Sequence, residues 1–78
     1  MTLAEVRAGE LLHVDALLAE PALRGRLATL GIVPGTVLRV LRRMPAGGPL
    51  DVDVRGVRLA LRVADARRIE GHAPPPPR

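Results

Sequence analysis

Residues 50–61 carry the pattern that most constrains the fold, because two short runs with a period of two meet at a turn signal. Every second residue is apolar and would lie on one face of an extended strand: Leu50, Val52, Val54, Val57, Leu59 and Leu61. Arg55 and Gly56 separate the runs, which predicts a β-hairpin with a two-residue turn. This register places Asp53 opposite Arg58 on the solvent face.

The remaining segments predict short elements. A capping-box pattern at Thr2 and Glu5 predicts one helical turn at the start of the chain. We expect the others to be a strand over 11–17, a helix from Pro21 to Leu30, a strand from Thr36 to Arg43, a helical turn over 64–67 and a strand at 69–70.

Simple alternation assigns faces to these elements. It places Leu12, Val14 and Ala16 on one face of the first strand, and Leu38, Val40 and Arg42 on one face of the second. In the helix, the stripe that faces the core is Leu23, Leu27 and Leu30. We assign the tight turns to Gly31, Gly35 and Gly56.

These elements predict a mainly β protein: a small curled β-barrel of about five strands, with one short α-helix between the first two strands. A closed barrel is favoured because closure limits exposed strand edges in a short chain. We place the domain at residues 1–71. Residues 72–78, "HAPPPPR", are predicted to be an extended or disordered proline-rich tail, because proline cannot join a sheet ladder.

The residue types that are absent exclude several functions. The chain has no Phe, Tyr or Trp, so its core must be aliphatic, and it has no aromatic side chains for stacking bases or lining a proline-peptide groove. It has no cysteine, which excludes disulfides and thiolate metal sites. No segment approaches the roughly 20 apolar residues that span a bilayer. We therefore expect a soluble, unprocessed cytoplasmic protein.

Catalytic and metal-binding groups are sparse. His13 and His72 are the candidate general bases, but no Ser or Cys nucleophile is present, so we do not expect an enzyme or a cofactor. The candidate metal ligands are Glu10, His13 and Asp15. Only His13 and Asp15 share a strand face, and two ligands do not make a site. The sequence "GIVPG" at 31–35 lacks the lysine and the strand-to-helix context of a phosphate loop.

Charge leaves two interpretations open. Twelve basic residues, all arginine, outnumber eight acidic ones. One interpretation is an RNA-binding or DNA-binding barrel, and the other is a solvated face paired with Asp51 and Asp53. The arginines concerned are Arg39, Arg42, Arg43, Arg58 and Arg62.

The order of motifs from Leu27 to Glu70 resembles the FeoA family of small proteins that accompany the ferrous-iron transporter FeoB. The shared features are Leu30-Gly31-Ile32, Pro34-Gly35, a strand at 37–41, Pro45 with Gly47-Gly48-Pro49, a hairpin about Gly56, "LALR" at 59–62, Ala66 and Ile69. The opening "TLAEVRAGE" also resembles the start of the family's sequences, so the resemblance covers residues 2–70.

This resemblance implies an SH3-like β-barrel and a non-enzymatic role in ferrous-iron uptake, in which the protein contacts the cytosolic part of FeoB, a membrane GTPase-permease. It also allows the SH3-like domain of an iron-dependent regulator of the DtxR type. Loops on a rigid barrel commonly carry recognition, so we expect two partner-binding loops. These comprise Leu30, Ile32 and Pro34 after the helix, and Met44, Pro45, Gly47, Gly48 and Pro49 at a hairpin tip.

Overall fold

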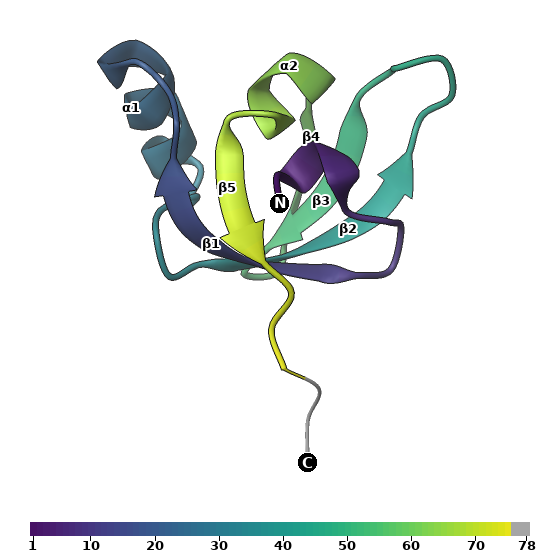
Figure 1. The fold of residues 1–78 in the computed structure, drawn as a ribbon. Coiled ribbons are helices and arrows are strands. Elements are labelled where there is room, and N and C mark those ends of the chain that lie inside the picture. The colour runs from purple at the N-terminus through teal and green to yellow at the C-terminus, as the bar shows by residue number, and fades with distance from the viewer. Residues whose placement is uncertain (76–78) are drawn as a thin grey trace.

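The computed structural model describes residues 1–75 and contains five strands, two α-helices and one 3₁₀ turn. Figure 1 shows the sheet curving beneath the two helices and the N-terminal turn. In chain order the elements are η1 (Leu3–Glu5), β1 (Leu11–Leu17), α1 (Pro21–Thr29), β2 (Val37–Arg43), β3 (Leu50–Val54), β4 (Val57–Leu61), α2 (Val63–Ala66) and β5 (Ile69–His72).

The strands form one antiparallel sheet in the order β4-β3-β2-β1-β5. The predicted β3–β4 hairpin is confirmed: Val54 pairs with Val57, and Asp53 pairs with Arg58. Arg55 and Gly56 both have positive φ angles, of 53° and 84°, as the central residues of a type I′ turn do. The local turn signal therefore sets the register of the whole hairpin.

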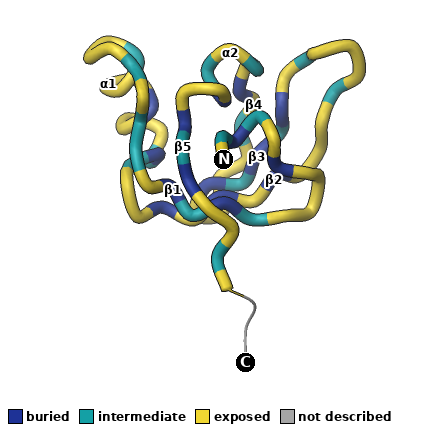
Figure 2. The backbone as a smooth tube through the Cα atoms, in the orientation of Figure 1, coloured by how far each residue is buried: buried dark blue, intermediate teal, exposed yellow. Residues whose placement is uncertain are grey.

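The core is entirely aliphatic, as the composition requires. Figure 2 shows the buried residues concentrated along the strands, whereas the β2–β3 connection and most of α1 are exposed. The buried cluster is Leu3, Val6, Leu12, Val14, Leu27, Ile32, Leu38, Val40, Leu50, Val52, Val54, Leu61, Ala66 and Ile69. Burying Leu, Val and Ile side chains at about 1.5–3 kcal/mol each supplies the main stabilisation of so small a domain.

The prediction of a closed barrel is wrong, because the outer strands β4 and β5 do not pair with each other. The short helix α2 occupies the connection between them. The outer edge of β5 is covered by the N-terminus: Thr2 forms a bridge with Glu70, and the Gly71 N–H donates to the Met1 carbonyl at 2.8 Å. Edge protection on this side thus comes from the chain terminus rather than from closure.

In β1 and in β2, a bulge interrupts the strict alternation of side chains from which the two faces of the strand are predicted. The β1–β5 register shifts between Val14 and Ala16, which leaves Asp15 as the extra residue. Leu17 consequently packs against the core, although simple alternation placed it on the opposite face from Leu12.

In β2 the register shifts between Val40 and Arg42, so Leu41 is the extra residue. Arg42 then pairs with Asp51 on the solvent face and does not share the buried face of Leu38. The prediction that Arg42 lies on that face is wrong, because a single inserted residue reverses the direction of every later side chain.

Helix α1 begins at Pro21 as predicted and ends in a Schellman motif. The Gly31 N–H donates to the Ala28 carbonyl, and the Ile32 N–H donates to the Leu27 carbonyl, both at 2.9 Å. Gly31, Gly35 and Gly56 all have positive φ, which confirms the three predicted turn glycines.

The last strand is longer than predicted. It runs to His72, so the boundary between residues 71 and 72 falls inside β5, and His72 belongs to the sheet and not to the tail. Residues 73–75 have no regular structure. The rest of the predicted tail, residues 76–78, lies outside the described residues.

Candidate functional site

The first predicted partner-binding loop follows helix α1. Leu30, at the C-cap, is 44% exposed, and Pro34 is exposed. Ile32, in contrast, is fully buried and cannot belong to an exposed surface as predicted. The reason is the Schellman motif, in which the second residue after the cap packs back on the helix; Ile32 and Leu27 both belong to the buried cluster. An apolar residue directly after a helix-ending glycine is the sequence signal for this burial.

The second predicted loop is the tip of the β2–β3 connection. The Met44 N–H donates to the Pro49 carbonyl at 3.1 Å, and the Gly48 N–H donates to the Pro45 carbonyl at 3.2 Å, so the tip is a folded turn. Pro45, Gly47 and Pro49 are exposed, and Met44 and Gly48 are half-buried.

The structure does not bring these two loops together. In Figure 1 the α1–β2 connection lies at the lower left of the molecule, and the tip between β2 and β3 lies at the upper right. A partner that contacts both loops would have to span the domain, so they are two separate candidate surfaces.

Leu30 instead joins a groove that the sequence did not predict. The groove lies between α1 on one side and the end of β4 with α2 on the other, and it combines an apolar floor with a charged rim. We call it the α1–β4 groove; its lining residues are Leu23, Arg26, Leu27, Leu30, Ala60, Leu61, Arg62 and Asp65. It exists because the sheet is open at β4, a feature that alternation within single strands cannot reveal.

The five arginines considered for nucleic-acid binding all contact acceptors within the protein. Arg42 and Arg58 contact the Asp51 carboxylate at 3.2 Å, and Arg62 lies 3.7 Å from Asp65. Arg39 donates to the Gly9 carbonyl and Arg43 donates to the Val6 carbonyl, each at 2.8 Å. Arg42, Arg58 and Arg62 are therefore partly offset by carboxylates, Arg42 and Arg58 by the same one, whereas Arg39 and Arg43 contact neutral carbonyls and keep their full charge.

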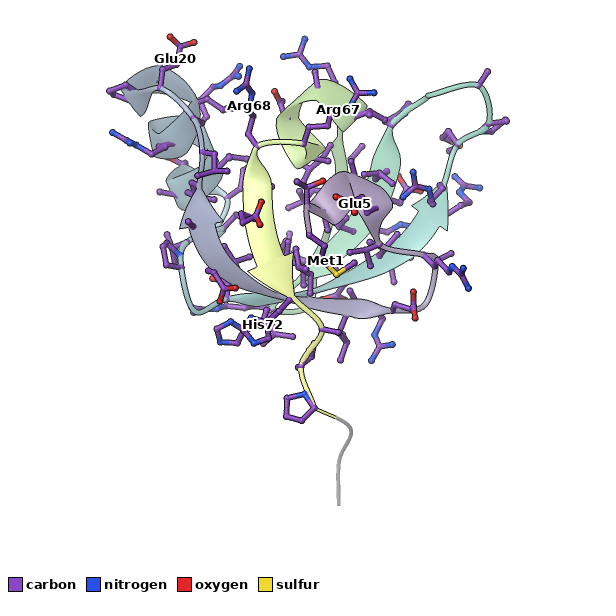
Figure 3. All side chains as sticks on the ribbon, in the orientation of Figure 1. Met1, Glu5, Glu20, Arg67, Arg68 and His72 are labelled. Atoms are coloured by element: carbon purple, nitrogen blue, oxygen red, sulfur yellow. The ribbon has the colours of Figure 1, made fainter. Side chains whose placement is uncertain are left out.

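His13, Asp15 and His72 meet on the solvent face of strands β1 and β5. His13 pairs directly with His72 in the sheet register, and their ring centroids stack 4.8 Å apart. Figure 3 shows His72 at the lower edge of the sheet, where β5 ends. Glu10, the third ligand considered from the sequence, is not in this cluster.

The Asp15 carboxylate is the centre of this cluster. His72 Nδ1 lies 2.8 Å from Asp15 Oδ2, and His13 Nδ1 lies 3.4 Å from Asp15 Oδ1. The hydrogen bond with His72 is the main cause that lowers the pKa of Asp15 below its ordinary value. The sequence interpretation missed this cluster because it assigned His72 to the tail.

Of the helices in residues 1–75, none has the length and apolar character needed to cross a bilayer.

Solved structures similar to this chain define its class as an SH3-like domain. The FeoA protein of Stenotrophomonas maltophilia in complex with zinc, a procaryotic SH3 domain protein, is 34% identical, with a TM-score of 0.80 over 92% of this chain and 89% of that one. A manganese-dependent transcriptional repressor in complex with manganese is 27% identical, with a TM-score of 0.86 over 94% of this chain but 36% of that one. The chain thus spans about a third of the repressor's length.

The family follows from two further matches. The model of the FeoA domain matches residues 1–72, and the FeoA protein of Chlorobium tepidum is 42% identical, with a TM-score of 0.86 over 94% of this chain and 70% of that one. This chain belongs to the FeoA family, which is associated with ferrous iron transport. The resemblance stated from the motif order is confirmed, and its match extends through His72.

Proposed function

We propose that this protein is a non-enzymatic accessory factor of ferrous-iron uptake, which acts in the cytoplasm by binding the cytosolic part of a FeoB-type GTPase-permease. The observation that carries this proposal is the FeoA match over residues 1–72. The Stenotrophomonas protein has been put forward as a ferrous iron transport activating factor, which supports the same role here.

The domain offers its partner a rigid surface and no evident reaction chemistry. The chain has no Ser or Cys, and its two histidines lie together at one carboxylate on an open sheet face. Apolar side chains held by a fixed scaffold favour docking of another protein.

The α1–β4 groove is the docking surface that the geometry favours. Leu30 is 44% exposed beside the half-buried Leu23, and Arg26 and Arg62 stand at the rim. An apolar floor with a polar rim is the usual arrangement of a protein interface. The hairpin tip with Met44 remains the second predicted surface.

The alternative role, as the SH3-like domain of a metal-dependent regulator, has less support. Identity to the FeoA protein of Chlorobium tepidum is 42%, against 27% for the manganese-dependent repressor. The nucleic-acid alternative also loses some support, because Arg42, Arg58 and Arg62 contact carboxylates within the domain.

The proposal is tested in cells by deleting the gene and measuring uptake of radiolabelled ferrous iron. We expect uptake to fall, and to be restored by the wild-type gene and by Val57→Asp, which alters an exposed apolar residue outside the groove. Leu30→Asp should restore less if the groove is used, and Met44→Asp should restore less if the hairpin tip is used. Unchanged uptake after deletion, together with no association with FeoB, would refute the role.

A further inference from the structure

The stacked histidines and Asp15 occupy adjacent positions for reasons of sheet geometry. Directly paired residues on antiparallel strands hold their Cβ atoms about 4.5–5.5 Å apart, which sets the spacing of His13 and His72. Asp15 is two residues after His13 and is the extra residue of the β1 bulge. Bulges redirect side chains and are common at functional sites, and here Asp15 lies against both imidazoles.

Strands β1 and β5 lie very close together beside His13 and Gly71. A Cβ atom added to Gly71, which precedes His72, would overlap the carbonyl oxygen of His13. Gly71 is buried and is held by the hydrogen bond from its N–H to the Met1 carbonyl. The backbone that carries His72 is therefore fixed relative to the backbone that carries His13.

The side-chain atoms are arranged as ligands that have nearly converged. One atom from each of the three residues lies within 4.8 Å of the other two. Ligand atoms around a metal with bonds of about 2.0–2.2 Å lie about 3–3.5 Å apart. Two of the three separations, the 2.8 Å and 3.4 Å distances from Asp15 to His72 and His13, are close to this range.

One atom of the cluster is unsatisfied by protein groups. His13 Nδ1 is shielded from solvent and, among the described residues, has no hydrogen-bond partner of good geometry, although Asp15 Oδ1 is 3.4 Å away. A plain ion pair between Asp15 and His72 leaves this nitrogen without a partner. A cation at the cluster would use it, because a neutral imidazole nitrogen is a common metal ligand.

We propose that His13, Asp15 and His72 form a surface site for one divalent transition-metal ion. Two imidazoles and one carboxylate suit zinc, iron(II), cobalt and nickel, whereas magnesium and calcium prefer oxygen ligands alone. The three side chains are 37%, 47% and 55% exposed, in chain order, so the remaining coordination positions face solvent. The site is suited to exchange its metal with the surroundings rather than to bury it.

This inference does not rest on the proposed function, since it concerns the isolated chain. Zinc is the most convenient probe, because it has no redox chemistry and binds nitrogen and oxygen ligands. Calorimetric titration of the full, untagged chain with Zn²⁺ should give one ion per chain, and Mg²⁺ should give no binding heat at the same concentrations. In nuclear magnetic resonance spectra, the ¹⁵N signals of both imidazoles should shift as Zn²⁺ is added.

Variants test the ligand set directly. His13→Gln and His72→Gln should each weaken Zn²⁺ binding by at least about tenfold, since even partners that only orient a ligand contribute 10–100-fold. His72 is the last residue of β5 and its side chain is 55% exposed, so His72→Gln retains the fold even if His13→Gln does not. Glu20→Gln is the matched control, because it removes an exposed carboxylate at the start of α1, away from His72 in Figure 3.

Binding of Zn²⁺ with unchanged affinity by His72→Gln, or loss of affinity in Glu20→Gln equal to that in His72→Gln, would overturn the site. The absence of saturable Zn²⁺ binding by the wild-type chain would also overturn the site. These outcomes are independent of iron uptake and of association with FeoB, so failure of the site and failure of the proposed function are distinguishable.

Discussion

The carboxylate of Asp51 lies 3.2 Å from the guanidinium of Arg58, although its direct partner in the β3–β4 register is Ala60. The ion pair is therefore diagonal. Asp51 also contacts Arg42 from β2, so one side chain connects three neighbouring strands. Asp53, the direct partner of Arg58, accepts instead from the Gly56 N–H at 2.9 Å and stabilises the turn.

Asp51→Asn should destabilise the domain by about 0.5–1.5 kcal/mol, because cross-strand charge pairs contribute roughly 0.2–1 kcal/mol each. The loss should shrink in about 1 M salt, where exposed charges are screened. Asp65→Asn is the control, since the ion pair of Asp65 with Arg62 is longer, at 3.7 Å. Urea denaturation at two salt concentrations measures both variants; equal losses for both would contradict the role given to Asp51.

Two glycines should respond in opposite directions to alanine. Gly71→Ala should cost at least about 2 kcal/mol, because its Cβ would collide with the His13 backbone, which cannot move aside like a flexible side chain. Gly25→Ala should stabilise by about 0.5–1 kcal/mol, because Gly25 lies within α1 and a Cβ there meets nothing within 4 Å. Thermal denaturation of both variants checks the prediction, and a stable Gly71→Ala variant would mean that β1 and β5 are farther apart.

Gly35→Val should lower stability by about 1–3 kcal/mol, because Gly35 has a φ of 95° and a β-branched residue is strained there. A Cβ at this position meets nothing within 4 Å, so the whole cost comes from the backbone. Gly35→Asn should cost less, since asparagine tolerates positive φ better. For a domain of this size, 1 kcal/mol corresponds to about 4–8 °C in Tm. An unchanged Tm for the valine variant would refute the turn.

The arginine excess should produce only weak binding to polyanions. Arg42, Arg58 and Arg62 contact carboxylates of the protein, which offsets part of the charge of this surface. On a heparin column the chain should therefore elute early, with a shallow dependence on salt. Retention that falls steeply with salt would favour the nucleic-acid interpretation.

Local patterns predicted the elements well. The period of two, the Arg55-Gly56 turn and the proline and glycine at the ends of α1 are each encoded by neighbouring residues, and the corresponding strands and helix are present. The errors in the predicted faces of β1 and β2 arose where one inserted residue reversed the direction of the side chains that follow it. Nothing local marks Asp15 or Leu41 as the extra residue of a bulge, because the choice depends on the partner strand.

The sites were harder to predict, since they combine distant segments. The α1–β4 groove exists because the sheet does not close, and the histidine cluster exists because β5 reaches His72. Both bring together segments that are distant in the sequence, α1 with β4 in the groove and β1 with β5 in the cluster, which alternation within a strand cannot specify. The family resemblance supplied the role, but it did not locate either site.

The central claim, that this domain binds a FeoB-type permease, is tested most directly by titrating the purified domain into the purified cytosolic part of FeoB from the same cell. We predict saturable binding, reduced at least about tenfold by Leu30→Asp, the equivalent of about 1.4 kcal/mol, and unaffected by Val57→Asp. Met44→Asp tests the hairpin tip in the same assay. The absence of saturable binding by the folded wild-type domain would contradict the claim.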